Sequence, residues 1–474
     1  MFYLIKLFLS FIKTSPTILV ARRSRVKYNE TMIKFIVLFF ILSANAHALK
    51  IPELTLSESL QEQKQGNEFL QIIWNTNSVI DDVEAQSYLG NLGHGLVKYS
   101  ENPDKHFGFF FLNDNSINAF AGSYGYIGVH TGMLLSSESE SELAGVLSHE
   151  ISHVTQNHLA RFSEKTDKQT YIMVAGMLAA ALVNNSDASQ AIATSTVAAT
   201  AQQNINFTRE HEWEADRIGT NMLIKSGFDP KGMAHFFEKL KDDVNAQEFL
   251  RSHPLSVNRI SDSMQRTSRL EGDYREDSFE YKSIKAKLYY HHYKRIKIEN
   301  DPSLTLYMKA YDALELQKYA LAKDYIVQLL KLNQSAPSQI LAGRIYAKSD
   351  DLELAQQYFS KVSSKEAGIY YAAQAYFDAD QTSKGIKLLR NYLKRNTASY
   401  QSHKLLSSLY VEEGQLDRAH IYNAKALILQ GKLKEAVSRY ERAKTTTRSQ
   451  DVFDVVDVEI ERLEKQLDLY KELP

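Results

Sequence analysis

Two histidines four residues apart, with a glutamate beside the first, are the residues of this sequence best suited to metal chemistry. They are His149, Glu150 and His153, in the pattern His-Glu-x-x-His. On a helix, positions i and i+4 share a face, so both imidazoles can reach one metal ion while the glutamate holds a water beside it. Because a chain with 14 histidines can carry this pattern by chance, the interpretation depends on the elements around the motif.

Short strands and a capped helix are predicted around this motif. Aromatic and apolar runs bounded by turn residues predict strands over 107–112, 117–120 and 126–129. Ser139 and Glu142 then form a capping box before a helix whose apolar residues recur at helical spacing. We therefore expect an α+β domain whose helix presents the motif. The strand over 126–129 is expected to bind an extended substrate by main-chain pairing.

A catalytic zinc usually has three protein ligands and one open position, so the motif needs a third ligand. We do not expect that ligand on the same helix, because Gln156 and Leu159 occupy the positions where a longer histidine motif needs Gly and His. His158 misses this register by one residue. We interpret it as a solvated histidine or as one that contacts a metal ligand from behind.

An acidic run further along the chain offers a carboxylate ligand. It reads Glu-His-Glu-Trp-Glu-Ala-Asp over 210–216. A helix here places Glu212 and Asp216 on one face, which suits a ligand followed by an acid that accepts the ring N–H of a ligating histidine. From the residues alone, the run is equally well explained as a solvated helix face between Arg209 and Arg217.

Composition excludes several classes of function. Lys and Arg number 56, Asp and Glu 57, and the net charge is −1, so no overall charge favours nucleic acid as a partner. The chain has no cysteine, which excludes a thiol nucleophile, a thiolate metal site and a disulfide framework.

The N-terminal region has the pattern of a secretory signal. After Met32 come a lysine, an unbroken apolar run over 35–42, and an Ala-His-Ala sequence that ends at Ala48. We expect cleavage near Ala48, which places the mature protein in the periplasm, and we treat 1–48 as an N-terminal extension plus signal peptide. The alternative is that apolar segments over 2–20 and 35–42 anchor an uncleaved protein.

Between the two metal motifs, an apolar segment over 171–183 is interpreted either as a lid or as an ordinary buried helix. We expect part of 164–205 to be exposed.

The predicted domains are a metalloprotease domain over 49–270, a junction over 271–303 and a helical domain over 304–474.

The helical domain is repetitive. Small residues pair twelve positions apart, at a spacing between pairs near the 34 residues of tetratricopeptide repeats. The pairs are Ala310 with Ala322, Gly343 with Ala355, Ala373 with Gly385, and Ser407 with Ala419. Small residues allow paired helices to approach closely. We therefore predict an all-α tetratricopeptide-repeat solenoid of four or five degenerate repeats, whose concave face binds other proteins.

The two metal motifs together resemble a known family. SELAGVLSHEISHVTQNH followed by HEWEADRIG is similar to the gluzincin metalloproteases that include the HtpX heat-shock protease and the CaaX prenyl-protease. This resemblance implies a zincin-type fold with one Zn²⁺ per chain. It also implies that Glu212 is the third zinc ligand, beside His149 and His153, and that Asp216 is the orienting acid.

Further segments narrow the resemblance. INAFAGSYGYIGVHTGMLL upstream, SHPLSVNRI downstream, the signal peptide and the repeats are similar to the periplasmic β-barrel assembly-enhancing proteases. The resemblance implies a zinc endopeptidase in quality control and assembly of outer-membrane β-barrel proteins, with chaperone-like activity. Its implied partners are unfolded or stalled outer-membrane proteins and, through the repeats, the barrel-assembly machinery.

The segment His253-Pro254 with Arg259 completes the candidate site. By the same resemblance, His253 can close over the zinc as a fourth ligand and hold the enzyme latent. The alternative is a histidine that caps a turn before Pro254. Arg259 is a candidate for stabilising developing negative charge or pairing with an active-site carboxylate, or it forms a structural ion pair. The candidate catalytic residues are thus Glu150, Asp216 and Arg259.

A second class of function stays open. The repeats would then act as a periplasmic chaperone or scaffold, with a zinc that is structural or permanently capped by His253. Glu150 favours an enzyme, because a purely structural zinc site does not need a base.

Overall fold

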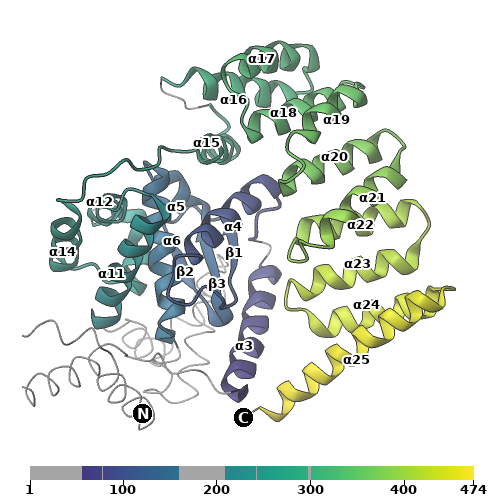
Figure 1. Ribbon diagram of the computed structural model, residues 1–474, viewed down its shortest axis with the longest axis horizontal. Coiled ribbons are helices and arrows are strands. Elements are labelled where there is room, and N and C mark those ends of the chain that lie inside the picture. The colour runs from purple at the N-terminus through teal and green to yellow at the C-terminus, as the bar shows by residue number, and fades with distance from the viewer. Residues whose placement is uncertain (1–55, 77, 160–208, 242, 297–299, 474) are drawn as a thin grey trace, which may run out of the picture. The chain divides into compact units, whose positions relative to one another are not determined.

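The computed structural model describes residues 56–76, 78–159, 209–241, 243–296 and 300–473 (Figure 1). The predicted leader over 1–48 and the segments over 164–205 and 171–183 lie outside these residues. Within the described ranges, no helix combines the length and apolar character needed to cross a membrane.

A three-stranded sheet lies beside the helix that carries the histidine motif. Its strands are β1 (Gly108–Leu112), β2 (Ala119–Ala121) and β3 (Tyr126–His130), in the spatial order β1-β3-β2. β1 pairs with β3 in parallel, and β2 pairs with β3 antiparallel, with Phe120 opposite Gly128. A Cβ on Gly128 would collide with the Phe120 ring, so glycine lets the two strands approach.

The strand order corrects one expectation. The segment over 126–129 lies in β3, which has a neighbour on both sides and therefore cannot accept a substrate strand. Residues beside Ser78 cover the outer edge of β1, since Ile80 N–H donates to Phe111 and Asn113 N–H donates to Ser78. Among the described residues, no strand pairs with the outer edge of β2. β2 is consequently the edge at which an extended chain can be added.

Helix α6 (Glu140–Thr155) carries the histidine motif and is buried along its whole length. Ser139 caps it, accepting the Glu142 N–H at 3.2 Å. The second half of the capping box differs from expectation, because the Glu142 carboxylate accepts the N–H of Glu138 and not that of Ser139. α6 packs against β2, α4 (Val83–Val97), α11 (Arg209–Ser226) and α12 (Lys231–Leu240). These neighbours cover the helix, so it lies inside the domain.

Other helices complete the part of the chain before residue 296. They are α3 (Leu56–Asn75), α5 (Thr131–Ser136), α13 (Gln247–Ser252), α14 (Val257–Thr267) and α15 (Phe279–Tyr293), with short 3-10 turns η2 (Ser123–Gly125) and η3 (Val244–Ala246). Apolar residues of α5, α13, α14 and α15 join those of α4, α6 and the sheet in one core, whereas those of α3 pack against the sheet in a separate cluster. The main core thus surrounds α6 and holds its position relative to α11.

From residue 302 onward the described chain is entirely helical, with successive helices lying side by side (Figure 1). The helices are α16 (Pro302–Glu315), α17 (Tyr319–Leu332), α18 (Ala336–Ala347), α19 (Leu352–Ser360), α20 (Glu366–Asp378), α21 (Thr382–Leu393), α22 (Tyr400–Glu412), α23 (Leu416–Ile428), α24 (Leu433–Thr446) and α25 (Gln450–Glu472). The small residues noted in the sequence lie where paired helices touch. A Cβ on Gly385 would lie 2.8 Å from the Ala373 carbonyl oxygen, and Ser407 Oγ donates to the Ala419 carbonyl at 2.8 Å.

Buried charges connect the two parts of the described chain. Lys287 on α15 is buried and lies 3.1 Å from Glu84 and 3.2 Å from Asp82. Arg344 on α18 lies 3.3 Å from the same Glu84 carboxylate. Burial lowers the pKa of Lys287, but the charges of Asp82 and Glu84 outweigh it and raise that pKa well above its usual value. The lysine therefore stays charged in its buried position.

Candidate metal centre

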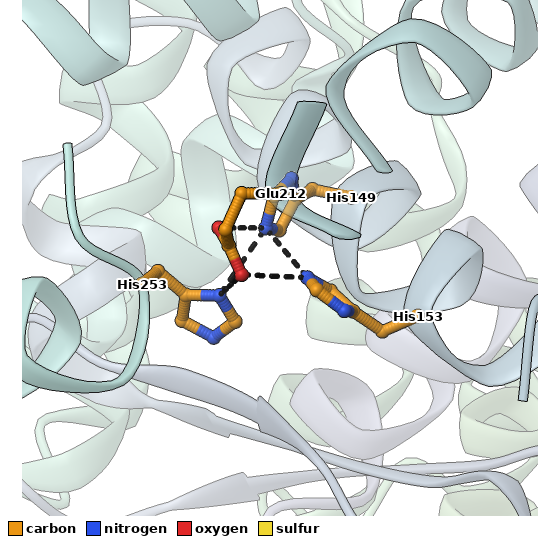
Figure 2. A group of neighbouring side chains, drawn as sticks. All are labelled: His149, His153, Glu212 and His253. Carbon is orange, nitrogen blue, oxygen red and sulfur yellow. Dashed lines mark hydrogen bonds and ion pairs between the residues drawn. The ribbon is translucent and has the colours of Figure 1, made fainter. Parts of the chain in front are cut away.

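Four side chains from three separate segments converge at one buried point (Figure 2). α6 presents His149 and His153 one turn apart, α11 presents Glu212, and His253 follows α13. One ligand atom from each of these residues lies within 4.8 Å of the others, and all four side chains are buried. The structure thus brings together the three expected ligands and the expected fourth.

The distances between these atoms fit a tetrahedral ion. His149 Nε2 lies 3.0 Å from His153 Nε2, and the Glu212 oxygens lie 3.4 to 3.5 Å from these two nitrogens. Ligand atoms about 2.0–2.1 Å from a tetrahedral zinc lie about 3.3–3.4 Å apart. Two imidazoles and a carboxylate are also the donor set of many catalytic zinc sites. The residues present therefore fit one zinc ion.

Glu150 lies in this site with a carboxylate that accepts no hydrogen bond from the described residues and has only an ion-pair contact, with His253 Nε2 at 3.4 Å. Both of its oxygens are buried, and among the described residues neither has a hydrogen-bond partner. Burial raises the pKa of Glu150, while the nearby histidines and the backbone of Ala121 on β2 lower it. An unsatisfied buried carboxylate costs about 1–3 kcal/mol or more. Such a cost points to a functional group whose partner is a water or substrate.

His253 faces both the ligands and the base. Its Nδ1 lies 3.3 Å from His149 Nε2 and 3.3 Å from Glu212 Oε1, at the fourth position of the cluster. Its Nε2 lies 3.4 Å from Glu150 Oε1. The ring stacks on Phe249 at 4.8 Å. A His253 in this place fills the position that an active zinc keeps open, and it also pairs with the candidate base.

Asp216 and Arg259 lie behind the ligands. Asp216 Oδ1 is 3.0 Å from His149 Nδ1, on the ring side opposite the cluster. Arg259 donates two hydrogen bonds to Asp216, both 2.8 Å, and lies 2.8 Å from Glu212 Oε2. Burial raises the pKa of Asp216, but bonds and charge from His149 and Arg259 outweigh it and lower that pKa. Arg259 therefore neutralises the carboxylates of Asp216 and Glu212. Of the roles considered for this residue, the contacts match pairing with a carboxylate of the site.

Two further polar groups lie near the site. His158 contacts His153 and reaches Glu214, so it takes the second of the two positions considered for it, behind a candidate ligand, whereas Glu248 was not expected from the sequence. Glu248 on α13 accepts from Ser116 at 3.2 Å, and Ser116 lies 2.7 Å from His130. His130 is buried, and burial lowers its pKa to about 4. No spacing in the sequence signals the contact of Glu248 with Ser116, because it joins segments that are 132 residues apart.

Comparison with known proteins agrees with this geometry. Residues 84–267 match the model of peptidase family M48, a family of metalloproteases that use zinc, and this range includes all four residues of the cluster. Two relatives are named as beta-barrel assembly-enhancing proteases. The Vibrio cholerae protein, a putative one, is 34% identical over 292 residues, which span 57% of this chain and 60% of that protein. The Escherichia coli protein is 28% identical over 417 residues, which span 82% of this chain and 84% of that protein.

Another match is shorter. Metalloprotease YcaL of Escherichia coli is 31% identical over 149 residues, or 31% of this chain and 56% of that protein. These matches confirm the resemblance inferred from the two metal motifs: residues 84–267 match an M48 metalloprotease domain, and the chain is similar to proteins named β-barrel assembly-enhancing proteases.

The ligand assignment makes a direct prediction about metal content. Glu212→Ala should lose most of the zinc, because it removes one of the three proposed ligands and leaves Arg259 Nη1 without its carboxylate partner beside the site. Glu210→Ala, two residues away on the exposed side of α11, should keep about one zinc per chain. Metal analysis of the purified proteins decides the matter, and equal zinc in both variants would contradict the assignment.

Proposed function

We propose that the protein is a periplasmic zinc endopeptidase that acts on outer-membrane β-barrel proteins during their assembly. The observation that carries this proposal is the convergence of His149, His153 and Glu212 beside a buried Glu150 whose oxygens are unsatisfied. The names of the two larger relatives supply the substrate class. The signal peptide predicted after Met32, with cleavage near Ala48, supports the periplasm as the compartment.

In this mechanism His149, His153 and Glu212 hold the metal, and Glu150 moves the proton. Bound zinc supplies Lewis acidity, which activates water and polarises the scissile carbonyl. Glu150 takes the proton of the attacking water and delivers it to the leaving amine. Asp216 keeps the His149 ring in one orientation, and Arg259 fixes Asp216 in turn. Asp216 and Arg259 thus act as positioning residues.

The outer edge of β2 is the proposed binding site for the substrate main chain. Asn118 and Gly122 pair with β3, so alternation turns the main-chain groups of Ala119 and Ala121 outward. The Ala121 amide lies near Glu150, as its effect on the pKa of that carboxyl indicates. A peptide added to this edge would pass the base. Main-chain pairing tolerates many sequences, which suits an enzyme that acts on unfolded proteins.

The helices after residue 302 are proposed to be tetratricopeptide repeats that dock the enzyme to its partners. α16, α18, α20 and α22 contact one another in turn, as the inner helices of such an array do. A cavity of about 320 Å³ lies among α16, α18 and α20 and includes Gln317, Lys348 and Gln374 in its lining. We propose this face as the docking surface for the barrel-assembly machinery.

A scaffold without catalysis is the weaker alternative. It would require a zinc site that His253 caps permanently, and it would leave Glu150 with no use for its buried charge.

Substrate trapping in the envelope tests the proposed function. Full-length Glu150→Gln protein, with a photo-cross-linking residue at Gln374, should retain outer-membrane β-barrel proteins and cross-link to the assembly machinery. The same residue at Val327, which is 43% exposed on the outer helix α17, should retain the same substrates without that cross-link. Retention of no β-barrel protein would contradict the substrate class, and equal cross-linking from both positions would contradict the docking face.

A further inference from the structure

His158 lies immediately behind one of the candidate zinc ligands. The His153 ring turns Nε2 toward the cluster, so Nδ1 faces away from it. That Nδ1 lies 2.8 Å from His158 Nδ1, and the opposite nitrogen of His158, Nε2, lies 3.1 Å from Glu214 Oε2. The His158 side chain is fully buried, whereas that of Glu214 is 36% exposed.

We propose that His158 is a positioning residue that orients His153 through a hydrogen-bonded chain ending at Glu214. This proposal rests on the proposed function, because it assigns His153 as a zinc ligand.

The chemistry of ligation fixes the direction of every bond in this chain. A histidine that binds zinc through Nε2 carries its remaining proton on Nδ1. His153 must therefore donate, and His158 must accept at Nδ1. The proton of a neutral His158 then resides on Nε2, where it donates to the Glu214 carboxylate. One carboxylate thus sets the tautomers of two rings in series.

Local backbone conformation brings His158 to this position. α6 ends at Thr155, and Asn157 has φ +52°, in the left-handed region that asparagine adopts more readily than most residues. Lys105 holds the turn, because its Nζ donates to the Val154 carbonyl at 3.2 Å and to Asn157 Oδ1 at 2.6 Å. The chain reverses, and the next side chain returns beneath His153.

Helix α11 serves both zinc histidines. Glu212 and Asp216 face the metal cluster and His149, while His211 and Glu214, three residues apart, face His158. The His211 ring stacks on His158 at 4.4 Å with an interplanar angle of 14°, which restricts rotation of the His158 ring. The buried carboxylate of Asp216 thus orients His149 directly. The partly exposed carboxylate of Glu214 orients His153 indirectly, through the imidazole of His158.

Isosteric variants separate hydrogen bonding from packing. In His158→Asn, the amide oxygen takes the place of Nδ1 and still accepts from His153. In His158→Gln, the amide reaches the place of Nε2 and keeps only the bond to Glu214. His158→Phe keeps the ring and its stacking but offers no acceptor, so it leaves the buried His153 N–H unsatisfied.

The measurement is zinc affinity of the full chain by competition with a chelator. We expect His158→Phe and His158→Gln to bind zinc about 10- to 100-fold more weakly, as loss of such outer partners does elsewhere, and His158→Asn to recover most of the loss. His235→Asn, at an exposed histidine of α12, should match the unmodified protein. The proposal would be overturned if His158→Phe bound zinc as tightly as His158→Asn, or more tightly. A role in packing alone predicts this result, because phenylalanine preserves the stacked ring and asparagine does not.

A second variant does not depend on a buried position. Glu214→Ala should weaken zinc binding by less than His158→Phe, since water can replace a partly exposed carboxylate, but by more than Glu210→Ala. Equal affinity of Glu214→Ala and Glu210→Ala would also overturn the proposal. If the unmodified protein itself binds no zinc, the proposed function fails and not merely the role of His158.

Discussion

Glu150→Gln should lower the rate of proteolysis by about 10²- to 10⁴-fold, the usual contribution of a general base. Glutamine keeps the size and shape of the side chain but cannot take a proton from water. The change also removes a buried charge whose oxygens have no hydrogen-bond partner among the described residues, so the fold should not suffer. Casein cleavage by the purified full-length chain is the measurement.

The zinc content of the same variant separates a lost base from a lost site. Glu150 does not belong to the ligand cluster, so Glu150→Gln should keep its metal. Because His253 lies within the ligand cluster, the comparison is sharpest when both proteins also carry His253→Ala. Glu210→Gln, on an exposed glutamate, is the matched control and should cleave at the unmodified rate. Cleavage by Glu150→Gln at more than about a tenth of that rate would show that another group is the base.

Local patterns predicted the elements of the site well. The spacing of His149 and His153 placed both rings on one face of a helix, and Ser139 marked where that helix begins. These features depend on residues within one or two turns, where helix geometry is fixed by the backbone. The small residues of the C-terminal helices also lie at helix contacts, because close approach restricts their side-chain volume directly.

Arrangements that join distant segments were harder to predict. Choosing Glu212 as the ligand over Glu210 and Glu214 required the family resemblance. All three glutamates lie on one helix, and only the packing of that helix decides which of them faces α6. The prediction that the strand over 126–129 binds substrate was wrong. The sequence of a short strand does not indicate whether the strand lies at the edge of its sheet. The contact of His158 with His153 depends on the left-handed Asn157, which has no strong pattern around it.

Removal of His253 is expected to raise the rate of proteolysis. Two hypotheses for this residue predict opposite signs. If His253 is a fourth ligand, the resting enzyme has no open position, and His253→Ala admits water while the other three ligands keep the zinc. If His253 instead stabilises the transition state as a hydrogen-bond donor, the same change lowers turnover without altering zinc content.

The geometry favours the first hypothesis. His253 Nδ1 lies among the ligand atoms and Nε2 lies near Glu150, so one ring blocks both the metal and the base. The segment that carries His253 also lies against the start of β2, where Ile117 N–H donates to the Asn245 carbonyl at 3.0 Å. If His253 closes the metal site, the segment that carries it therefore lies close to the proposed substrate edge.

The casein cleavage rate of His253→Ala relative to the unmodified chain decides between the hypotheses. We expect a rise of about tenfold or more, which corresponds to a closed state favoured by at least ~1.4 kcal/mol. His253→Phe, which keeps the stacking on Phe249 but cannot ligate, should rise as well. His235→Ala, at an exposed histidine, should leave the rate unchanged. A clear fall in both His253 variants with zinc retained would refute the fourth-ligand role and assign His253 to catalysis, because a ring that only blocks the site cannot be needed for turnover.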